Sequence, residues 1–355
     1  CDYRGSVISE LVPVKVDPAT ADRDFWKRFH EFRRIRHAEL WPDDPLRPDE
    51  VIEIHMSHPD SFDQREYFEM SRDGKMISWL STETVTPNNP EYETNKHLCW
   101  AEAYVRPEYR RKGVGSRWLG LLTDNMGEHG CTVVGVTAVH EEGHAFLRWL
   151  GAEIKLEELE SRLDLSAVDW DLMERWVREG QERSPQTRLE IYDGGVPEEL
   201  IEDFAVQRST MLNTMPFDDL EIGKIIVTPE RIRQWLEKAR LMGVVEHNVL
   251  TREPDGTISG MTDVEWAPYG QGLIQQQFTG VLPSARGRGI GKWIKAAMLL
   301  HVRKLHPDTK WISTENANSN APMLKINRAM GFKPYRRTVE YQMSREKLEA
   351  KLRTL

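Results

Sequence analysis

The stretch VRPEYRRKGVG, residues 105–115, recurs in altered form as VLPSARGRGIG, residues 281–291. Both contain a Val, a Pro, an Arg and two Gly residues at the same spacing. In each case an apolar segment typical of a strand precedes the pattern, and a segment with helical periodicity follows it. Glycines let a backbone approach a ligand closely, and a helix start offers unpaired N–H groups and a positive dipole end. Each stretch therefore predicts a phosphate-binding loop.

Two further landmarks repeat in the same order. SRDGKMIS (71–78) and EPDGTISG (253–260) each carry an Asp-Gly pair, which is a strong signal for a β-hairpin. Downstream, LRWLGAE (147–153) parallels NRAMGFK (327–333). Because all the landmarks recur at nearly one offset, the sequence predicts two copies of one domain.

Each copy follows one plan of mixed strands and helices around a sheet, which predicts an α/β (α+β) domain, duplicated in tandem. We expect the N-terminal copy over residues 1–165 and the C-terminal copy over residues 187–355. Residues 166–186 are expected to form a linker helix, ended by Gly180 and by the break at Ser184-Pro185.

Composition restricts the classes of function. Of the 355 residues, 39% are hydrophobic and 30% are charged, with a net charge of −9, which is a soluble globular profile. The negative charge argues against a nucleic-acid surface and suits an amine-bearing partner. No apolar run approaches the roughly 20 residues that span a bilayer, so no membrane partner is expected.

The cysteines are Cys1, Cys99 and Cys131, and they form no CxxC pair. This usage favours a reducing, cytoplasmic compartment. Cys1 would suit a lipid-bearing mature terminus, but a processed or truncated chain is the favoured interpretation.

Two better-known phosphate loops do not fit the second stretch. A Walker A loop ends in Gly-Lys-Ser/Thr, whereas Gly291-Lys292 is followed by Trp293. The dinucleotide fingerprint requires GxGxxG, whereas the glycines here are Gly287, Gly289 and Gly291. A glycine-rich turn with solvated arginines is the remaining alternative, and the repetition in register disfavours it.

The residues resemble the GCN5-related N-acetyltransferase (GNAT) family, whose motif V-x-P-x-x-R/Q-x-x-G-x-G/A both stretches match at every fixed position. A later family signature, an Asn followed by a short helix and Gly-Phe, is present from Asn320 to Gly331-Phe332. The resemblance covers almost the whole chain as a tandem pair, an arrangement similar to mycothiol synthase. It implies a GNAT-like fold in each copy, with a mixed, mostly antiparallel sheet flanked by helices.

The resemblance also implies that acyl-CoA, most simply acetyl-CoA, is the acyl donor and that the loops bind its pyrophosphate. In the second copy the residues expected at the donor are Val281, Leu282, Pro283, Arg286, Gly287, Arg288, Gly289, Ile290, Gly291, Lys292, Asn316 and Asn320. In the first copy they are Val105, Arg110, Arg111, Lys112, Gly113, Val114 and Gly115.

The implied reaction is attack of an amine on the thioester. A lysine-like amine with a pKa of about 10.4 is only about 0.04% free base at pH 7, an uphill step of about 4.6 kcal/mol, so a base or a desolvating pocket has to supply part of it. Where the family often has an acidic Tyr, this chain has Leu147 and Asn327. Leu147 cannot donate a proton, and His140 replaces Asn320 in the first copy. We therefore expect the first copy to be degenerate and the second to catalyse transfer.

The expected catalytic residues are Glu315, Asn327, Glu340 and Tyr341. Further candidates are the carboxylates Asp263, Glu265 and Glu102 and the hydroxyl of Tyr335. For each carboxylate, a solvated surface position is the favoured alternative.

The stretch VHEEGH, residues 139–144, contains the HExxH spacing of helical zinc sites. Gly143 weakens the helix that would put both His residues on one face, and Leu150 occupies the place of a third His ligand. His140 aligns with Asn320 at a strand-to-helix junction. We therefore expect no metal there.

The leading prediction is a cytoplasmic N-acyltransferase that uses acetyl-CoA on a primary amine of a small molecule. A protein or peptide lysine acetyltransferase and a non-catalytic acyl-CoA-binding sensor or scaffold remain as alternatives.

Overall fold

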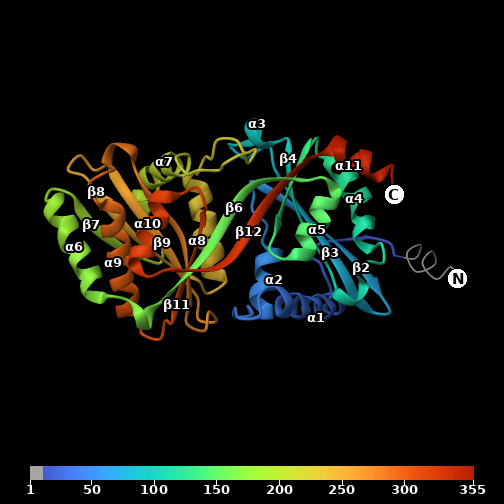
Figure 1. The fold of residues 1–355 in the computed structure, drawn as a ribbon, viewed down its shortest axis with the longest axis horizontal. Coiled ribbons are helices and arrows are strands. Elements are labelled where there is room, and N and C mark those ends of the chain that lie inside the picture. The colour runs from blue at the N-terminus through green and yellow to red at the C-terminus, as the bar shows by residue number, and fades with distance from the viewer. Residues whose placement is uncertain (1–10) are drawn as a thin grey trace. The chain divides into compact units, whose positions relative to one another are not determined.

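The computed structural model describes residues 11–355, which form two compact units (Figure 1). Unit 1 contains the described residues up to Leu156, together with Asp219–Gly223 and Val339–Leu355. Unit 2 contains Glu157–Asp218 and Lys224–Thr338. Cys1, the subject of the expectation about the terminus, lies outside the described residues.

Unit 1 is a sheet covered by helices. Its strands are β1 (Val14–Val16), β2 (Asp63–Arg72), β3 (Lys75–Val85), β4 (Leu98–Val105), β5 (Val133–Ala138) and the part of β12 (Lys333–Ser344) from Val339 onward. Its helices are α1 (Arg23–Leu40), α2 (Asp49–Ser57), α3 (Tyr92–Asn95), α4 (Val114–Glu128), α5 (Glu141–Leu150) and α11 (Arg345–Leu352). The strands pair in the order β1-β2-β3-β4-β5-β12, and only β4 with β5 is parallel.

Unit 2 repeats this architecture. Its strands are β7 (Arg188–Asp193), β8 (Val245–Arg252), β9 (Ile258–Trp266), β10 (Leu273–Val281), β11 (Trp311–Ala317) and the part of β6 (Glu153–Asp164) from Glu157 onward. Its helices are α6 (Trp170–Arg183), α7 (Ile201–Leu212), α8 (Pro229–Leu241), α9 (Ile290–Leu305) and α10 (Ala321–Met330). The order is β6-β11-β10-β9-β8-β7, with only β10–β11 parallel. The predicted mixed, mostly antiparallel sheet is confirmed twice.

The repeat extends to local irregularities. Asp73 and Gly74, with φ of 51° and 74°, provide the left-handed pair that a type I′ hairpin turn requires between β2 and β3. Gly256, with φ of 90°, turns the chain between β8 and β9. The pairing register shifts at Met70/Ser71 in one hairpin and at Thr251/Arg252 in the other. Both predicted Asp-Gly hairpins are thus present.

The two copies exchange their last strands. β12 of the second copy pairs with β5 of the first over Val339–Ser344, and β6 of the first pairs with β11 of the second over Glu158–Asp164. The exchanged strands supply buried side chains to the unit that receives them, namely Val339, Tyr341 and Met343 in unit 1 and Leu163 in unit 2. The compact units therefore differ from the contiguous segments 1–165 and 187–355 that the repeat suggests.

The expected linker helix is α6, which packs on α9 within unit 2. The break at Ser184 is confirmed, but Gly180 does not end the helix, which continues to Arg183. A Cβ at Gly180 would lie 2.3 Å from Cγ of Trp293 on α9. The missing side chain lets the two helices approach each other, and this packing overrides the poor helix propensity of glycine.

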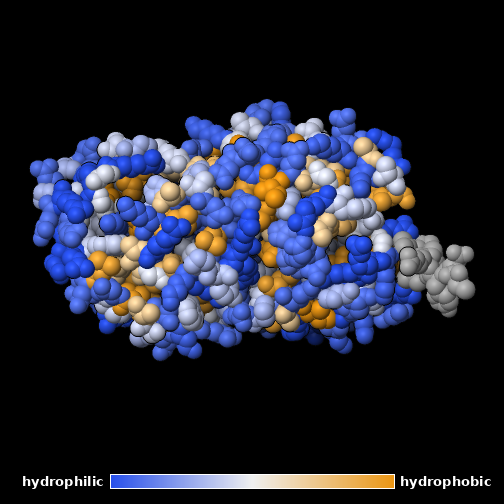
Figure 2. All heavy atoms as spheres, viewed as in Figure 1, coloured by the Kyte–Doolittle hydropathy of each residue, from blue (hydrophilic) through white to orange (hydrophobic). Residues whose placement is uncertain are grey.

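Surface character agrees with the composition. The face drawn in Figure 2 is mostly hydrophilic, with hydrophobic residues scattered between the polar ones. No helix among residues 11–355 combines the length and the apolar character that crossing a membrane requires.

The close contact between α6 and α9 can be tested with two glycine substitutions, which should change the stability of the protein in opposite directions. Gly180→Ala should destabilise the protein by about 1–3 kcal/mol, because the added methyl group overpacks against the Trp293 ring. Gly120→Ala is the matched control: Gly120 lies inside α4 with no atom within 4 Å of an added Cβ, so alanine should stabilise by up to about 1 kcal/mol. Urea unfolding followed by circular dichroism measures both. Stabilisation by both substitutions would contradict the close approach of α6 to α9.

Candidate functional site

Both predicted loops follow the same backbone path. After β4, a 3₁₀ turn (Pro107–Tyr109) leads to Gly113 at the start of α4, and after β10 a second 3₁₀ turn (Pro283–Ala285) leads to Gly289 at the start of α9. Gly113 and Gly289 are the N-cap residues, with φ of 80° and 84°. This left-handed conformation favours glycine, which explains why both copies have glycine there.

A second left-handed residue stands two positions earlier in each loop. Arg111 and Gly287 have φ of 57° and 81°. Turns of this kind gather successive N–H groups into a concave anion-binding surface. No side-chain hydrogen bond caps α4 or α9, so the first N–H groups and the positive dipole end of each helix face the loop. Both loops thus have the backbone geometry of a phosphate site.

The parallel strands beside each loop separate before they end. β4 pairs with β5 only over Leu98–Trp100, although β4 continues to Val105. β10 pairs with β11 only over Leu273–Gln276, and β10 shifts register against β9 between Gln276 and Phe278. The parallel pairing therefore stops after Trp100 in one unit and after Gln276 in the other. In each unit the strand that leaves the pairing, β4 or β10, leads directly into the loop.

The last glycine of each loop has a packing role. A Cβ on Gly115 would lie 3.4 Å from the Phe146 ring on α5, and one on Gly291 would lie 3.3 Å from Cδ1 of Ile326 on α10. Phe146 and Ile326 occupy equivalent positions in the repeat. The glycine pattern therefore serves helix packing as well as the loop itself.

Two arginines hold the loops closed. Arg110 donates from Nε to the carbonyl of Val105 at 2.9 Å, and Arg286 donates from Nε to the carbonyl of Val281 at 3.3 Å. The guanidinium of Arg110 also makes two hydrogen bonds to Glu39, at 2.6 and 2.7 Å. These arginines thus shape the loop in the same way in both units.

Three further cationic loop residues, Arg288, Lys292 and Lys112, also have contacts within the protein. Arg288 is held by three polar groups, those of Glu253, Thr187 and Ser184, at 2.9, 2.6 and 3.1 Å. Lys292 Nζ lies 5.0 Å from the centroid of the Trp176 ring, and Lys112 donates to the carbonyl of Glu108 at 2.7 Å. Backbone N–H groups therefore form the core of each candidate phosphate site.

In unit 2 the structure brings Asn316 and Asn327 together. Asn327, which is 2% exposed, donates from Nδ2 to Oδ1 of Asn316 at 2.7 Å. The buried Oδ1 of Asn327 has no hydrogen-bond partner among the described residues. Glu315 and Asn316 follow Thr314, where the pairing of β11 with β10 ends. Asn320 is the N-cap of α10 and accepts a hydrogen bond from a backbone N–H at 3.3 Å.

Glu315 accepts a hydrogen bond from the hydroxyl of Thr338. Desolvation raises the pKa of Glu315 above its ordinary value, and the hydrogen bond from Thr338 opposes the shift. Glu315 is therefore a carboxylate with a raised pKa, next to the point where β10 and β11 stop pairing.

The strand exchange places Glu340 and Tyr341 in unit 1. Glu340 accepts a hydrogen bond from the hydroxyl of Thr137 at 2.6 Å. Tyr341 is 2% exposed, with its hydroxyl 3.1 Å from Nδ1 of His144. The structure does not bring these two residues into one unit with the other expected catalytic residues, because β12 pairs with β5 and not with a strand of its own copy.

The remaining candidates are engaged in contacts: Asp263 with Arg208, Glu265 with Gln277, Glu102 with Arg36 and Tyr335 with Arg162. Asp263 is only 2% exposed, and its ion pair with Arg208 is 2.9 Å long. A buried charge needs such a partner, and Arg208 provides it.

Sequence reasoning missed Glu246, which lies on β8 directly opposite Glu265 on β9. Burial raises the pKa of Glu246 to about 7, the charge of Asp263 adds to the rise, and a hydrogen bond from Asn248 opposes it. A carboxylate with this pKa suits general base catalysis near neutral pH. No local motif marks it, because its environment comes from several separate elements.

The HEEGH stretch forms the start of α5. His140 is the N-cap residue, and its Nδ1 accepts a hydrogen bond from the N–H of Gly143 at 3.3 Å. Asn320 has the same position on α10. His144 lies in the helix and contacts the hydroxyl of Tyr341. The alignment of His140 with Asn320 is therefore confirmed by their shared role as helix caps.

Comparison with known proteins bears on the same features. Residues 26–152 match the family described as the acetyltransferase (GNAT) family. Among solved structures, a tandem GNAT protein from the clavulanic acid biosynthesis pathway, without acetyl-CoA, has a TM-score of 0.72 at 18% identity, covering 95% of this chain and 99% of its own. A GCN5-related N-acetyltransferase from Sphaerobacter thermophilus has a TM-score of 0.59 at 15% identity, covering 94% and 96%.

A third solved structure is a glucosamine N-acetyltransferase region of a fungal multi-domain β-N-acetylglucosaminidase, with a TM-score of 0.61 at 14% identity. It covers 95% of this chain and 38% of its own. The chain has no significant match among curated protein sequences. At these identities the structural likenesses show the fold alone. Residues 26–152 thus match the acetyltransferase (GNAT) family, and the chain as a whole has the tandem GNAT fold.

Proposed function

We propose that the chain transfers an acetyl group from acetyl-CoA to the primary amine of a small molecule. The observation that carries the proposal is the combination, in each unit, of an uncapped helix start, a left-handed glycine N-cap and an interrupted parallel ladder. An anion-binding loop suits the pyrophosphate of coenzyme A. When bound, the donor supplies an acyl thioester as the electrophile.

The loop from Gly287 to Gly291 would hold the donor in unit 2, and the loop from Arg111 to Gly115 would hold it in unit 1. We assign transfer to unit 2. Its Asn316–Asn327 pair offers a buried amide oxygen that suits a thiol or water hydrogen bond. The leaving thiolate needs less help than the amine, because the reference pKa of a thiol is only about 8.5.

A carboxylate of unit 2 is proposed to take the proton of the attacking amine. Glu246 is supported by its pKa of about 7, and Glu315 by its position where β10 and β11 separate. We favour Glu246. It lies opposite Glu265, which in turn lies opposite Gln275, one residue before the parallel pairing of β10 with β11 ends, and a base works best when its pKa lies near the working pH.

Unit 1 is proposed to support the reaction without catalysing it. Leu147, in place of Asn327, is 6% exposed and packs in an apolar cluster with Ala138, Val339 and Tyr341. The strand exchange nevertheless brings the hydroxyl of Tyr341 into this cluster. Catalysis in unit 1, with Tyr341 as the acid, is therefore the alternative to our assignment of transfer to unit 2. The proposed cytoplasmic location is consistent with Cys99 and Cys131, which are buried free thiols.

The first prediction tests the activity itself. Purified protein with acetyl-CoA should release free coenzyme A in the presence of small primary amines, measured with a thiol reagent across a panel. Lysine-containing peptides should react more slowly than the best small amine. Faster reaction of peptides would identify a protein acetyltransferase. Binding of acetyl-CoA without release for any acceptor would identify a sensor.

The second prediction compares the two loops by adding one negative charge to each. Direct substitution of Gly113 or Gly289 would strain a left-handed backbone, so the charge is placed at Ser116 and Lys292, the third residues of α4 and α9. Glu at this helix position is compatible with folding but repels phosphates. Lys292→Glu should lower kcat/KM for amine acetylation at least about 100-fold, or about 2.7 kcal/mol. Ser116→Glu should lower it less than about 10-fold.

Lys292→Ser, which introduces the first copy's residue, separates loss of the lysine from gain of the charge and should lose less than Lys292→Glu. Calorimetry with acetyl-CoA reports on each loop independently of turnover. The assignment is reversed if folded Ser116→Glu loses turnover and Lys292→Glu retains it.

The third prediction uses pH. Burial raises the pKa of Glu246 to about 7, so the carboxyl group is protonated and inactive as a base below that pH. kcat/KM should therefore rise with pH through about 7 before any rise from the amine near its own pKa of about 10.4. Glu246→Gln should remove this limb, whereas Glu315→Gln should retain it. Loss of the limb in Glu315→Gln alone would make Glu315 the base.

A further inference from the structure

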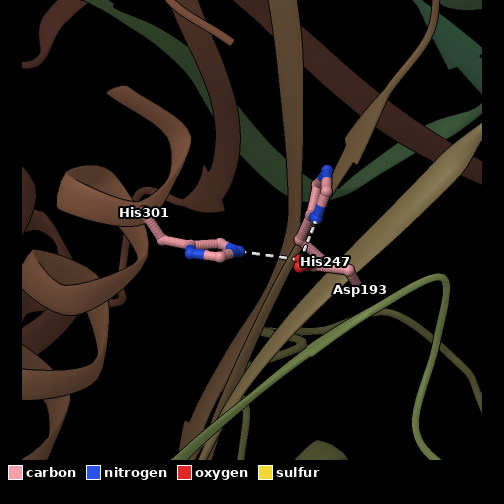
Figure 3. A group of neighbouring side chains, drawn as sticks. All are labelled: Asp193, His247 and His301. Carbon is pink, nitrogen blue, oxygen red and sulfur yellow. Dashed lines mark hydrogen bonds and ion pairs between the residues drawn. The ribbon is translucent and has the colours of Figure 1, made fainter. Parts of the chain in front are cut away.

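Three side chains with metal-binding atoms converge in unit 2: Asp193 at the end of β7, His247 on β8 and His301 on α9 (Figure 3). Oδ1 of Asp193 lies 2.6 Å from Nδ1 of His247 and 2.7 Å from Nε2 of His301. All three atoms lie within 4.8 Å of one another. We propose that this cluster binds one divalent transition-metal ion, with Zn²⁺ as the first candidate.

The fold fixes the cluster from two sides. Asp193 and His247 are directly opposite each other in the β7–β8 ladder, so their side chains project from one face of the sheet. His301 comes from α9, which packs against β8. The His247 side chain is 3% exposed, while that of Asp193 is 48% exposed. The site therefore has a buried wall and an open side, through which an ion enters and water completes its coordination.

Two imidazoles and a carboxylate are a ligand set that suits zinc. With metal–ligand bonds of about 2.0–2.1 Å, tetrahedral geometry separates the ligand atoms by roughly 3.3 Å, so an ion has to widen the two hydrogen-bond distances by less than about 1 Å. Asp193 has the most exposed side chain of the three, at 48% against 3% for His247 and 16% for His301, so its carboxylate has the most room to adjust.

The other nitrogen of His247 has a suitable partner. Nε2 of His247 lies 2.9 Å from Nε2 of His306, whose ring stacks on Trp266 at a centroid distance of 4.5 Å. When His247 donates a hydrogen bond from Nε2 to Nε2 of His306, its Nδ1 keeps a lone pair for the metal. Hydrogen bonds of this kind orient metal-bound histidines in general.

The first copy offers a natural comparison. Aligned on the loop glycines, His301 corresponds to Asn125, and aligned on the shared register shift of the hairpins, His247 corresponds to Glu66. Asn125 donates to Glu66 at 2.6 Å, and Nζ of Lys15 lies 2.7 Å from the same carboxylate. In unit 1 the ammonium group of Lys15 thus lies beside the carboxylate of Glu66. At the equivalent position in unit 2, two imidazoles face the carboxylate of Asp193. A metal ion held by the imidazoles would place a positive charge beside the carboxylate in unit 2 as well.

The test uses the full chain without an oligohistidine tag, stripped of metal with a chelator. Calorimetric titration with Zn²⁺ should show one ion per chain at this site, and Co²⁺ should give the visible absorption of a nitrogen- and oxygen-bound ion. His301→Asn introduces the first copy's residue and retains a donor for Asp193, so the fold should persist. This variant should bind Zn²⁺ at least about tenfold more weakly, or about 1.4 kcal/mol.

His140→Asn is the matched control, because it removes a histidine from HEEGH and introduces the cap residue of the second copy. It should leave Zn²⁺ affinity unchanged. Asp193→Asn, at an exposed strand end, provides a second variant should His301→Asn fail to fold, and it should weaken binding similarly. The proposal is overturned by absence of stoichiometric binding, by unchanged affinity in folded His301→Asn or Asp193→Asn, or by loss of the ion in His140→Asn instead.

Discussion

Antiparallel pairing of the exchanged strands decides which residues of this chain belong together. β5 and β11 are each the last strand of a run from their own copy, and their outer edges carry N–H and C=O groups that need a partner. β12 provides the partner for β5, and β6 provides it for β11. The exchanged strands also contribute side chains to the cores: Val339 and Tyr341 of β12 pack in a core of unit 1, and Leu163 of β6 packs in the core of unit 2. Neither copy completes its sheet from its own sequence.

Within that frame, the two loops differ in sequence but not in backbone. Arg111 and Gly287 share a left-handed conformation although one is arginine and the other glycine, and Arg110 and Arg286 make the same hydrogen bond to the strand before them. The glycines at the N-caps and at the helix contacts are required by geometry, which leaves the side chains between them free to vary. Chemical differences between the units therefore arise around the loops, at positions such as Leu147 and Asn327.

The features that could be predicted from the sequence are those that depend on neighbouring residues. The duplicated fold, the Asp-Gly hairpins, the break at Ser184 and the equivalence of His140 with Asn320 all follow from short patterns. The rest depends on contacts between distant segments. The strand exchange depends on whether each last strand pairs with β5 or with β11. The two edges are equivalent in the repeat, so hydrophobic periodicity does not distinguish between them. Gly180 has the signature of a helix end, but the ring of Trp293 gives it a place inside the helix.

The candidate site divides in the same way. The motif located the loops, and Asn316 and Asn327 proved to be hydrogen-bonded neighbours. The pKa of Glu246 depends first on its burial and then on the charges of Asp263 and Arg208, which come from other elements, so no spacing could reveal it. The pairing of Glu340 could not be predicted for a related reason: its position in the sequence assigns it to one copy, and its strand pairing assigns it to the other.

The strand exchange also sets an order of assembly during synthesis. β5 leaves the ribosome long before Val339–Ser344, the segment that pairs with it. At roughly 5–20 residues per second, the nascent chain carries an open edge on β5 for on the order of 10–40 s. β6, in contrast, is already made when β11 appears, so the sheet of unit 2 closes without delay. Unit 1 is begun first and completed last.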